Sequence, residues 1–197
     1  RGEVFPVTLE KITLSAKLKN KKIINGQSSI STSKYPIDKV FINPSSPLPS
    51  TGAINAIKKA KIIVLGPGSL YTSIIPNLLV KDVAKEIRHS KAKKIYICNI
   101  MTQPGETNKY KVSDHINAIV KHTGYDLINY IIVNIEEIPT NILNKYKAKN
   151  SYPVVIDEEN LKNYDIILIK EKILSIENDF IRHDSEKLAE ALINLSI

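Results

Sequence analysis

From Lys61 onward, continuous apolar runs alternate with amphipathic segments, and this pattern limits the possible folds more than any other feature. Strands that are buried on both faces read as unbroken apolar runs, whereas helices that cover a sheet carry apolar residues three or four positions apart. The expected strands are KIIVLG, KKIYICNI, LINYIIVN, YPVVI and DIILI. The alternation predicts an α/β fold, with a Rossmann-like open, mostly parallel sheet and helices on both faces.

Four stretches between and after these runs have helical spacing. Their apolar positions are Val83, Ala84 and Ile87; Ile116, Ile119 and Val120; Ile142, Leu143 and Tyr146; and Leu188, Ala191, Leu192 and Leu195. In open α/β sheets, ligands bind beyond the carboxyl ends of the strands. The residues that directly follow each strand are therefore the first candidates for a functional site.

Residues 1–50 have a different texture. The segment VFPVTL is expected to form a strand, and Ile12, Leu14, Ala16 and Leu18 alternate with polar residues as in a half-buried strand. Asn25-Gly26 supplies a turn, and the proline-rich loop NPSSPLPST precedes a short helix around Ala53 to Ala60. We expect an excursion of antiparallel strands and a loop in residues 1–50, followed by βα units in residues 51–197.

The composition is typical of a soluble globular protein. The chain has 197 residues, of which 43% are hydrophobic and 24% charged, and this length suits a single domain over residues 1–197. No apolar run approaches the roughly 18 residues of a membrane span, and the start lacks a signal-peptide layout. Cys98 is the single cysteine, and the four histidines lack ligand spacing. We expect a cytoplasmic protein without a membrane span, disulfide or metal site.

The formal net charge of +8 raises the alternative of a nucleic-acid-binding module. Only Arg1, Arg88 and Arg182 are arginines, and the other basic residues are lysines scattered along the chain. Bidentate phosphate recognition favours arginine, and a nucleic-acid surface needs a clustered patch. Solvated lysines on exposed faces are therefore the preferred interpretation.

A glycine-rich turn, GPGSLYTS, directly follows the run KIIVL. Gly66 and Gly68 leave the backbone open to a ligand, while Ser69, Thr72 and Ser73 add hydroxyl groups. The backbone amides of such a turn can bind a phosphate, although the sequence is neither a Walker loop nor GxGxxG. From the residues alone, a tight structural turn and an anion site are equally open.

A second polar segment, NIMTQPGET, follows the run KKIYIC. Asn99, Thr102 and Gln103 can hydrogen-bond the edge of a base or the hydroxyls of a sugar, and Glu106 offers an acceptor. A turn with a helix cap would account for the Pro-Gly pair but not for the amides. A ligand-binding role for this segment is therefore favoured.

Other polar residues stand at expected helix starts. Asp114 and His115 are interpreted as structural, the first as a helix N-terminal acid and the second as an interior histidine. Arg182 precedes a helix that Asp184 or Ser185 would cap, and it is a candidate phosphate or diphosphate contact. An ion pair with Asp184 is the alternative. Ser185 is a candidate phosphorylation site, with a plain cap as its alternative. No catalytic triad stands out, so catalytic residues are not assigned.

Three long motifs carry a family resemblance: GPGSLYTSIIPNLLV, YICNIMTQPGET and SDHINAIVKHTG. Together with the flanking segments RGEVFPVT and RHDSEKLA, they resemble the gluconeogenesis factor (YvcK-like) family, which is related to 2-phospho-L-lactate transferase. The GGGTG-type loop and the Asp-Asp-Gly-Gly segment at the start of that family do not occur in the sequence. The chain is therefore expected to be the C-terminal part of a longer Rossmann-like protein.

The resemblance implies a regulatory protein that binds a UDP-sugar, chiefly UDP-N-acetylglucosamine, and acts in carbon metabolism, cell-wall synthesis and cell shape. It implies that Tyr146 and Arg182 contact the sugar nucleotide, although the spacing of Tyr146 alone indicates a core residue. It also supports a Ser/Thr kinase as a partner through Ser185. No cofactor is implied beyond the nucleotide ligand, and a homo-oligomer is compatible with the family. A phospholactate-type transferase that uses a divalent metal is the first alternative, and the nucleic-acid-binding module is the second.

Overall fold

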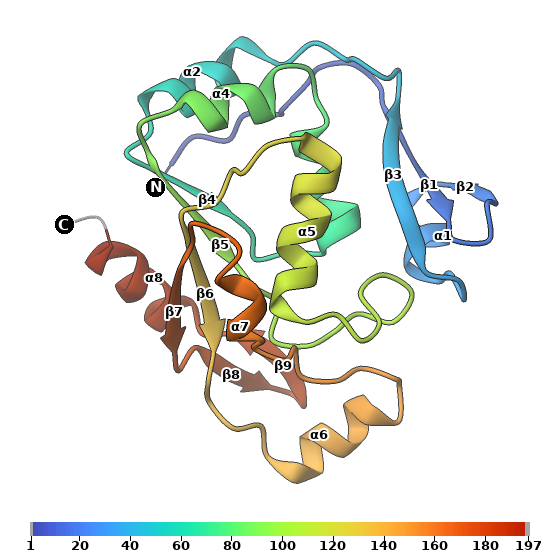
Figure 1. The fold of residues 1–197 in the computed structure, drawn as a ribbon, viewed down its shortest axis with the longest axis vertical. Helices are drawn as coiled ribbons and strands as arrows, with labels where there is room; N and C mark the ends of the chain where they lie inside the picture. The colour runs from blue at the N-terminus through green and yellow to red at the C-terminus, as the bar shows by residue number, and fades with distance from the viewer. Residues whose placement is uncertain (1, 196–197) are drawn as a thin grey trace.

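The computed structural model describes residues 2–195 (Figure 1). The strands are β1 (Thr13–Leu18), β2 (Ile23–Asn25), β3 (Ile37–Asn43), β4 (Ile62–Leu65), β5 (Lys93–Ile97), β6 (Tyr130–Asn134), β7 (Ile167–Glu171), β8 (Leu174–Glu177) and β9 (Phe180–His183). The helices are α1 (Gln27–Ser31), α2 (Thr51–Lys59), α3 (Ile75–Leu78), α4 (Val83–His89), α5 (Val112–Thr123), α6 (Thr140–Lys147), α7 (Glu158–Leu161) and α8 (Ser185–Asn194), with a π-helical segment η1 (Leu70–Ile74). None of the helices in this part of the chain is long and apolar enough to cross a membrane.

The centre of the molecule is a parallel sheet with the strand order β4-β5-β6-β7. Leu65 on β4 lies opposite Tyr96 on β5, and Ile97 on β5 lies opposite Ile132 on β6. Each crossover between neighbouring strands contains at least one helix, as parallel connections require. The predicted α/β class with a mostly parallel sheet is confirmed.

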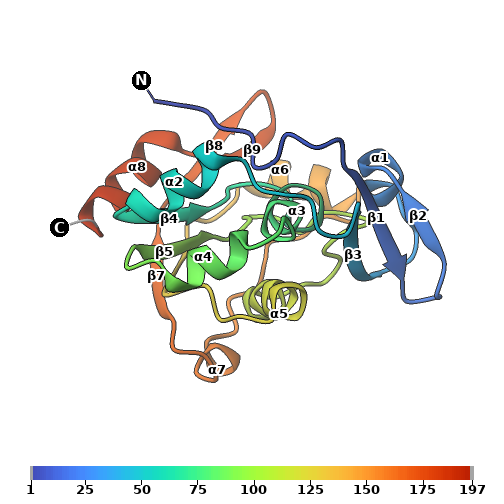
Figure 2. The same cartoon turned by 90° about the horizontal axis from the view of Figure 1, so that it is seen from above.

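The central strands β5 and β6 are buried on both faces, which explains why they read as continuous apolar runs. Tyr96 and Ile131 face the larger core, where they pack with Ile116 of α5. The alternate residues Ile95 and Ile97 face the opposite side and pack with the α8 group, which includes Leu188. Figure 2 shows α5 and α8 on the two sides of the strands. Burial of each large apolar side chain contributes roughly 1.5–3 kcal/mol, so the alternation stabilises both layers.

An antiparallel sheet with the order β2-β1-β3 forms the expected excursion near the start of the chain. It lies at the side of the molecule, with α5 between it and the parallel sheet (Figure 1). The prediction that VFPVTL forms a strand is wrong, because this segment has only an isolated bridge between Thr8 and Pro49. Asn25-Gly26 also does not close a hairpin, since Gly26, with φ of 86°, leads directly into α1.

The prediction of a strand at YPVVI is also wrong. Pro153 and Val155 form isolated bridges with Met101 and Lys111, outside the parallel sheet. Pro153 lacks a backbone N–H, which prevents continuous pairing. The next strand of the sheet is instead β7, as DIILI predicted, and the antiparallel hairpin β8–β9 follows it. That hairpin was not predicted, and its turn is Asn178-Asp179, both with positive φ.

Candidate functional site

A cleft of about 910 Å³ lies beyond the carboxyl ends of β4 and β5. Its volume is within the usual range for small-molecule sites. Four stretches of chain contribute to it: the glycine-rich turn, the segment after β5, the end of α6 with the residues that follow it, and the β8–β9 hairpin. The lining residues are Pro67, Gly68, Ser69, Asn99, Ile100, Met101, Thr102, Gln103, Pro104, Lys145, Tyr146, Lys149, Ser151, Asn178, Asp179, Phe180, Ile181, Arg182 and His183.

Most of the residues predicted as ligand contacts come together here. They are Gly68, Ser69, Asn99, Thr102, Gln103, Tyr146 and Arg182. Gly66 and Thr72 are not part of the lining. The sheet topology explains the convergence, because the ends of adjacent parallel strands meet at one edge.

The glycine-rich turn is built around Gly66 rather than Gly68. Gly66 has φ of 97°, and a Cβ placed on it would lie 3.2 Å from the carbonyl oxygen of Ile97 at the end of β5. Gly68 has no positive φ, and a Cβ there would be in ordinary contact with the Cβ of Ser73, at 3.4 Å. Gly66 therefore allows the turn to pack against β5, and Gly68 leaves the cleft side of the turn open.

Asn99 and Gln103 both line the cleft, and each has a buried amide oxygen that has no partner among residues 2–195: Oδ1 of Asn99 and Oε1 of Gln103. The Gln103 side chain is fixed, since its Nε2 donates to Oγ of Ser69 at 2.8 Å. Its backbone N–H also donates to Oγ1 of Thr107 at 2.9 Å. Gln103 therefore presents an acceptor, and a buried acceptor without a partner is costly in a native structure. Both oxygens are therefore candidate acceptors for a ligand with N–H or O–H donors.

Thr102 lines the cleft, but its hydroxyl is already used by the fold. Oγ1 accepts from the backbone N–H of Tyr152 at 3.0 Å, and the backbone N–H of Thr102 donates to the Tyr152 carbonyl at 2.7 Å. The hydroxyl of Ser151 donates to the Thr102 carbonyl at 2.6 Å. Thr102 therefore holds residues 151–152 at the wall of the cleft.

Tyr146 connects α6 to the β8–β9 hairpin. Its hydroxyl accepts from the backbone N–H of Ile181 at 2.8 Å, one residue before Arg182. Arg182 is exposed, with its guanidinium 5.6 Å from the ring centroid of Phe180. In the described part of the chain, Arg182 does not form the alternative ion pair with Asp184. Tyr146 thus holds the strand that carries Arg182 at the cleft.

The cleft has a basic rim. Lys145, Lys149 and Arg182 line it, and the one lining acid, Asp179, pairs with Lys145 at 2.5 Å. His183 adds a neutral group, because burial lowers its pKa although its hydrogen bond to the Cys98 carbonyl acts in the opposite direction. Such a rim favours an anionic ligand. Sequence reasoning missed Lys145, Lys149, Phe180 and His183, and the Asn178-Asp179 turn was the signal for the hairpin that carries two of them.

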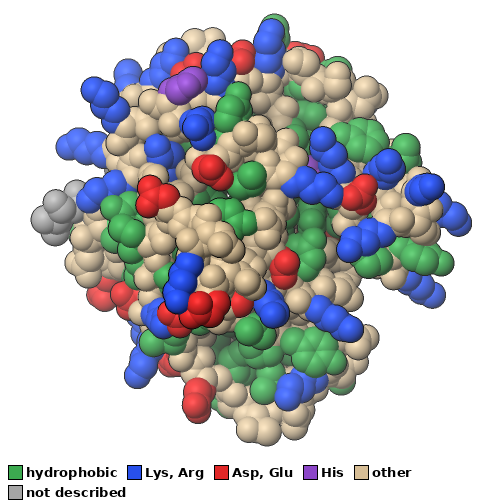
Figure 3. All heavy atoms as spheres, in the orientation of Figure 1, with side chains coloured by type: hydrophobic (Ala, Val, Ile, Leu, Met, Phe, Trp, Pro, Cys, Tyr) green, Lys and Arg blue, Asp and Glu red, His purple; other side chains and the backbone are tan. Residues whose placement is uncertain are grey.

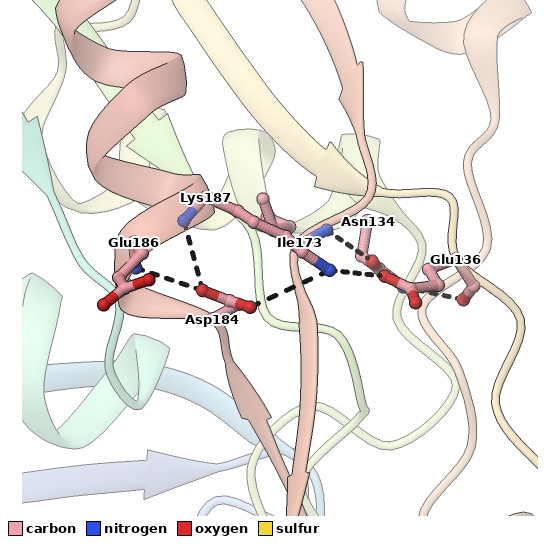
Figure 4. Close-up of polar contacts among 6 residues, drawn as sticks. All are labelled: Asn134, Glu136, Ile173, Asp184, Glu186 and Lys187. Carbon is pink, nitrogen blue, oxygen red and sulfur yellow. Dashed lines mark hydrogen bonds and ion pairs between the residues drawn. The ribbon is translucent and has the colours of Figure 1, made fainter.

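The base of the hairpin is anchored to β6 and α8 (Figure 4). Oδ1 of Asn134 accepts from the backbone N–H of Ile173 at 3.1 Å, and the Ile173 carbonyl accepts from the N–H of Asp184 at 2.8 Å. Oδ1 of Asp184 caps α8 by accepting from the N–H of Lys187 at 3.1 Å. The Lys187 ammonium lies 3.5 Å from Glu136. These contacts fix where β9 enters the cleft.

The remaining candidate residues have structural environments. Ser185 is the exposed first residue of α8, whose cap is Asp184. Asp114 accepts from the backbone N–H of Lys111 at 2.8 Å at the start of α5. His115 is fully buried, 2.8 Å from the hydroxyl of Tyr96. Within residues 2–195, no three His, Cys, Asp or Glu side chains are grouped so that they could hold a metal ion.

The basic side chains do not gather into one patch on the face drawn in Figure 3, where Lys and Arg are spread over many elements and mixed with Asp and Glu. Several lysines are paired, as in Lys121 with Asp38 at 2.7 Å and Lys170 with Glu158 at 2.7 Å. A scattered and partly paired distribution is typical of a solvated surface.

Comparison with known proteins finds similarity along nearly the whole chain. The family model for 2-phospho-L-lactate transferase CofD matches residues 1–174. A protein of Thermoanaerobacterium thermosulfurigenes is 48% identical over 98% of this chain. The gluconeogenesis factor of Bacillus subtilis (strain 168) is 43% identical over 99% of this chain. A crystal structure of a UPF0052 family protein from Bacillus halodurans superposes with a TM-score of 0.94 at 39% identity, over 98% of this chain.

The chain is shorter than these relatives. It spans 61% of the length of the Thermoanaerobacterium protein and 62% of the length of the Bacillus subtilis protein. It likewise covers 62% of the Bacillus halodurans chain in the crystal structure.

Proposed function

Because the chain belongs to the 2-phospho-L-lactate transferase CofD family and is a homologue of the gluconeogenesis factors, we propose that its cleft binds a sugar nucleotide and that the protein is a regulatory protein of the gluconeogenesis factor type. One observation carries this proposal: Asn99 and Gln103, whose buried amide oxygens have no partner among the described residues, line the same cleft as Arg182. A ligand that fits must combine hydrogen-bond donors with negative charge, as a sugar nucleotide does.

The charged part of the ligand would lie between the glycine-rich turn and the hairpin. Gly68 leaves the backbone of the turn accessible, Ser69 adds a hydroxyl, and Arg182 faces the same cleft from β9. A guanidinium makes strong charge-assisted hydrogen bonds with phosphate oxygens. We assign the diphosphate to this part of the cleft.

UDP-N-acetylglucosamine is the sugar nucleotide that we propose. The uracil imide, the sugar hydroxyls and the acetamido group supply the O–H and N–H donors that Asn99 and Gln103 lack. The family resemblance further suggests roles in carbon metabolism, cell-wall synthesis and cell shape. It also suggests a Ser/Thr kinase as partner, for which the exposed Ser185 is the proposed target.

Titration calorimetry on the full-length protein with UDP-N-acetylglucosamine, UDP-glucose, UDP, GDP and NAD tests the proposal. We expect selective binding of a UDP-sugar, and weaker but measurable binding in Asn99→Ala and Gln103→Ala. Asn55→Ala on α2 is the matched control, since Asn55 is exposed and not part of the cleft lining. Equal or absent binding of all five compounds would show that the cleft is not a sugar-nucleotide site.

The name of the matching family model supports a transferase as the second candidate function. A transferase would move the phosphorylated acid from a nucleotide-activated acid to the oxygen of an alcohol with the help of a divalent metal, breaking the diphosphate bond and releasing the nucleoside monophosphate and the alcohol proton. Phosphorus NMR of the protein with Mg²⁺, a nucleotide-activated acid and an alcohol acceptor distinguishes the two candidates, because a regulatory protein leaves the activated acid intact and a transferase releases the nucleoside monophosphate.

A further inference from the structure

Glu106 is a buried acid next to the cleft but outside its lining. Its side chain belongs to a residue that is only 4% exposed. Oε1 accepts from the hydroxyl of Ser31 on α1 at 2.9 Å and from the hydroxyl of Thr72 on η1 at 3.0 Å. Oε2 is buried and has no partner in the described residues. Glu106 therefore joins the antiparallel unit, which comprises β1, β2, α1 and β3 (residues 13–43), to η1, which follows the glycine-rich turn.

The backbone around Glu106 is a tight turn that also holds Gln103. The N–H groups of Glu106 and Thr107 both donate to the Gln103 carbonyl, at 3.1 and 2.9 Å. Between them and Gln103 lies Gly105, with φ of 84° and a position for Cβ only 2.5 Å from the carbonyl oxygen of Ser31. Only glycine allows this approach, so the turn is pressed directly against the end of α1.

Two side chains of this turn bond to η1 and to Ser69, the residue just before it, with matching spacing. Gln103 bonds to Ser69, and three residues later Glu106 bonds to Thr72, which is three residues after Ser69. Two parallel contacts prevent the turn and the start of η1 from sliding past each other. The bond from Nε2 of Gln103 to Ser69 also fixes the orientation of the Gln103 amide, so that Oε1 is left as an acceptor.

We propose that Glu106 is a positioning residue for the cleft: by holding Thr72 and Ser31 together, it keeps η1 in the register that lets Ser69 orient Gln103. The role in affinity rests on the proposed sugar-nucleotide function, whereas the role in orienting Gln103 does not. Glu106 itself does not touch the ligand. It transmits the position of the antiparallel unit to the cleft.

Two substitutions of Glu106 distinguish a role that depends on its hydrogen bonds from one that depends on its charge. A glutamine at this position keeps an oxygen that can accept from both Ser31 and Thr72, and it places its NH2 group where Oε2 has no partner. An alanine removes both hydrogen bonds. If positioning is the role, Glu106→Gln behaves like the wild type and Glu106→Ala does not.

The first test measures UDP-N-acetylglucosamine affinity by calorimetry. We expect Glu106→Ala to bind about two- to tenfold more weakly, the equivalent of one net hydrogen bond, and Glu106→Gln to bind as the wild type does. In the Gln103→Ala background, Glu106→Ala should add no further loss, because the group that it positions is gone. Equal losses in Glu106→Gln and Glu106→Ala, or additive losses in the double variant, would overturn the proposal.

The second test needs no ligand and uses nitrogen-15 NMR of the Gln103 side-chain amide, assigned from the signal lost in Gln103→Ala. The wild type and Glu106→Gln should show one amide proton shifted by its bond to Ser69. Thr72→Val, which removes one donor and keeps a similar shape, should move the signal toward that of a free amide even if Glu106→Ala does not fold. An unmoved signal in Thr72→Val contradicts the positioning role, whether or not a sugar nucleotide binds.

Discussion

At the level of single residues, the two glycines of the turn after β4 have different tasks. A Cβ at Gly66 would need a positive φ and would press on the Ile97 carbonyl, whereas a Cβ at Gly68 meets only ordinary contacts. We therefore expect Gly66→Ala to lower the free energy of unfolding by roughly 1 kcal/mol or more, and Gly68→Ala to change it little. Urea unfolding of both variants checks this. Similar unfolding midpoints for the two would contradict the assignment.

Gly68→Ala has a second use, because the turn is proposed to approach a phosphate. A methyl group on the cleft side of the turn should weaken UDP-sugar binding while leaving the unfolding midpoint unchanged. If Gly68→Ala retains the affinity of the wild type, the turn has a structural role only.

Substitution of Arg182 is expected to change ligand affinity strongly and the stability of the fold very little. Its guanidinium stacks over Phe180 and is exposed, so Arg182→Ala should leave the melting temperature nearly unchanged. A charge-assisted bond to a diphosphate contributes roughly 1.5–3 kcal/mol, so affinity should fall about ten- to a hundredfold. Arg182→Lys should recover part of it, because an ammonium retains the charge but not the planar fork.

Arg88→Ala is the matched control for Arg182, because Arg88 also stacks on a ring, that of Tyr125, and is not part of the cleft lining. Calorimetry and thermal unfolding of all three variants give the comparison. A large loss of affinity in Arg88→Ala, or none in Arg182→Ala, would remove Arg182 from the site.

Prediction from sequence succeeded at residues whose position follows from strand order and was limited at residues whose role depends on distant contacts. Asn99 and Gln103 follow a buried strand, so their place at the sheet edge could be inferred. The role of Tyr146 could not, because helical spacing indicates only the buried face of α6. Its bond to Ile181 joins residues 35 positions apart, and no local pattern encodes it.

At the level of elements, β8–β9 is the part of the cleft that sequence reasoning missed. Its strands are short and lie at the surface, and Phe180 and Ile176 are exposed, so neither strand gives the continuous apolar run of a buried strand. Conversely, YPVVI has that run but lacks a neighbouring strand to pair with. Continuous apolar runs therefore identified the strands of the buried parallel sheet. They did not identify β8 and β9, and they wrongly indicated YPVVI, because a strand also requires a neighbouring strand with which to pair.

The attachment of α6 to this hairpin is testable. Tyr146→Phe removes the acceptor for the Ile181 N–H and keeps the ring. We expect a decrease in unfolding free energy of about 1 kcal/mol and weaker UDP-sugar binding, because β9 would present Arg182 less firmly. Tyr35→Phe, at an exposed tyrosine on the antiparallel unit, is the control. Unchanged affinity in Tyr146→Phe would mean that β9 holds its place without this bond.

Two buried histidines on α5, His115 and His122, are expected to make the stability of the fold depend on pH. His122 donates from Nδ1 to the Ala118 carbonyl and accepts at Nε2 from the N–H of Val40 on β3, so its neutral form joins α5 to the antiparallel sheet. Burial lowers the pKa of His122, and it lowers the pKa of His115 to about 4. Protonation of His122 would remove the acceptor that Val40 needs.

The sign of the pH effect follows from these lowered pKa values. The unfolded chain takes up protons at these histidines near their ordinary pKa of 6.5, whereas the folded chain does not until the pH is lower. The histidine contribution to stability should therefore be complete above about pH 6.5 and decline as the pH falls toward 4. Urea unfolding between pH 4 and 7.5 measures it, and His122→Gln should flatten the profile. His89→Gln, at an exposed histidine, is the control, and an equally steep profile in His122→Gln would exclude His122 as a cause.

At the level of the whole molecule, the cleft joins stretches of chain that are far apart in sequence, from Pro67 on one wall to His183 on another. These stretches belong to the parallel sheet, α6 and the hairpin, and Glu106 adds the antiparallel unit through Ser31. A ligand held by all of these parts binds the folded chain and not the unfolded one. Ligand binding should therefore stabilise the entire fold rather than one loop.

UDP-N-acetylglucosamine should raise the free energy of unfolding and the melting temperature by amounts that depend on its concentration. At a free concentration of about 100 times Kd, binding adds about 2.7 kcal/mol to the free energy of unfolding. For a chain of this size, each kcal/mol raises the melting temperature by about 2–4 °C, so we expect an increase of roughly 5–11 °C. Differential scanning calorimetry over a series of ligand concentrations measures it. The increase should grow with the logarithm of concentration and shrink in Arg182→Ala at equal ligand concentration. An increase of the same size in Arg182→Ala, or one that GDP reproduces, would indicate binding elsewhere than in this cleft.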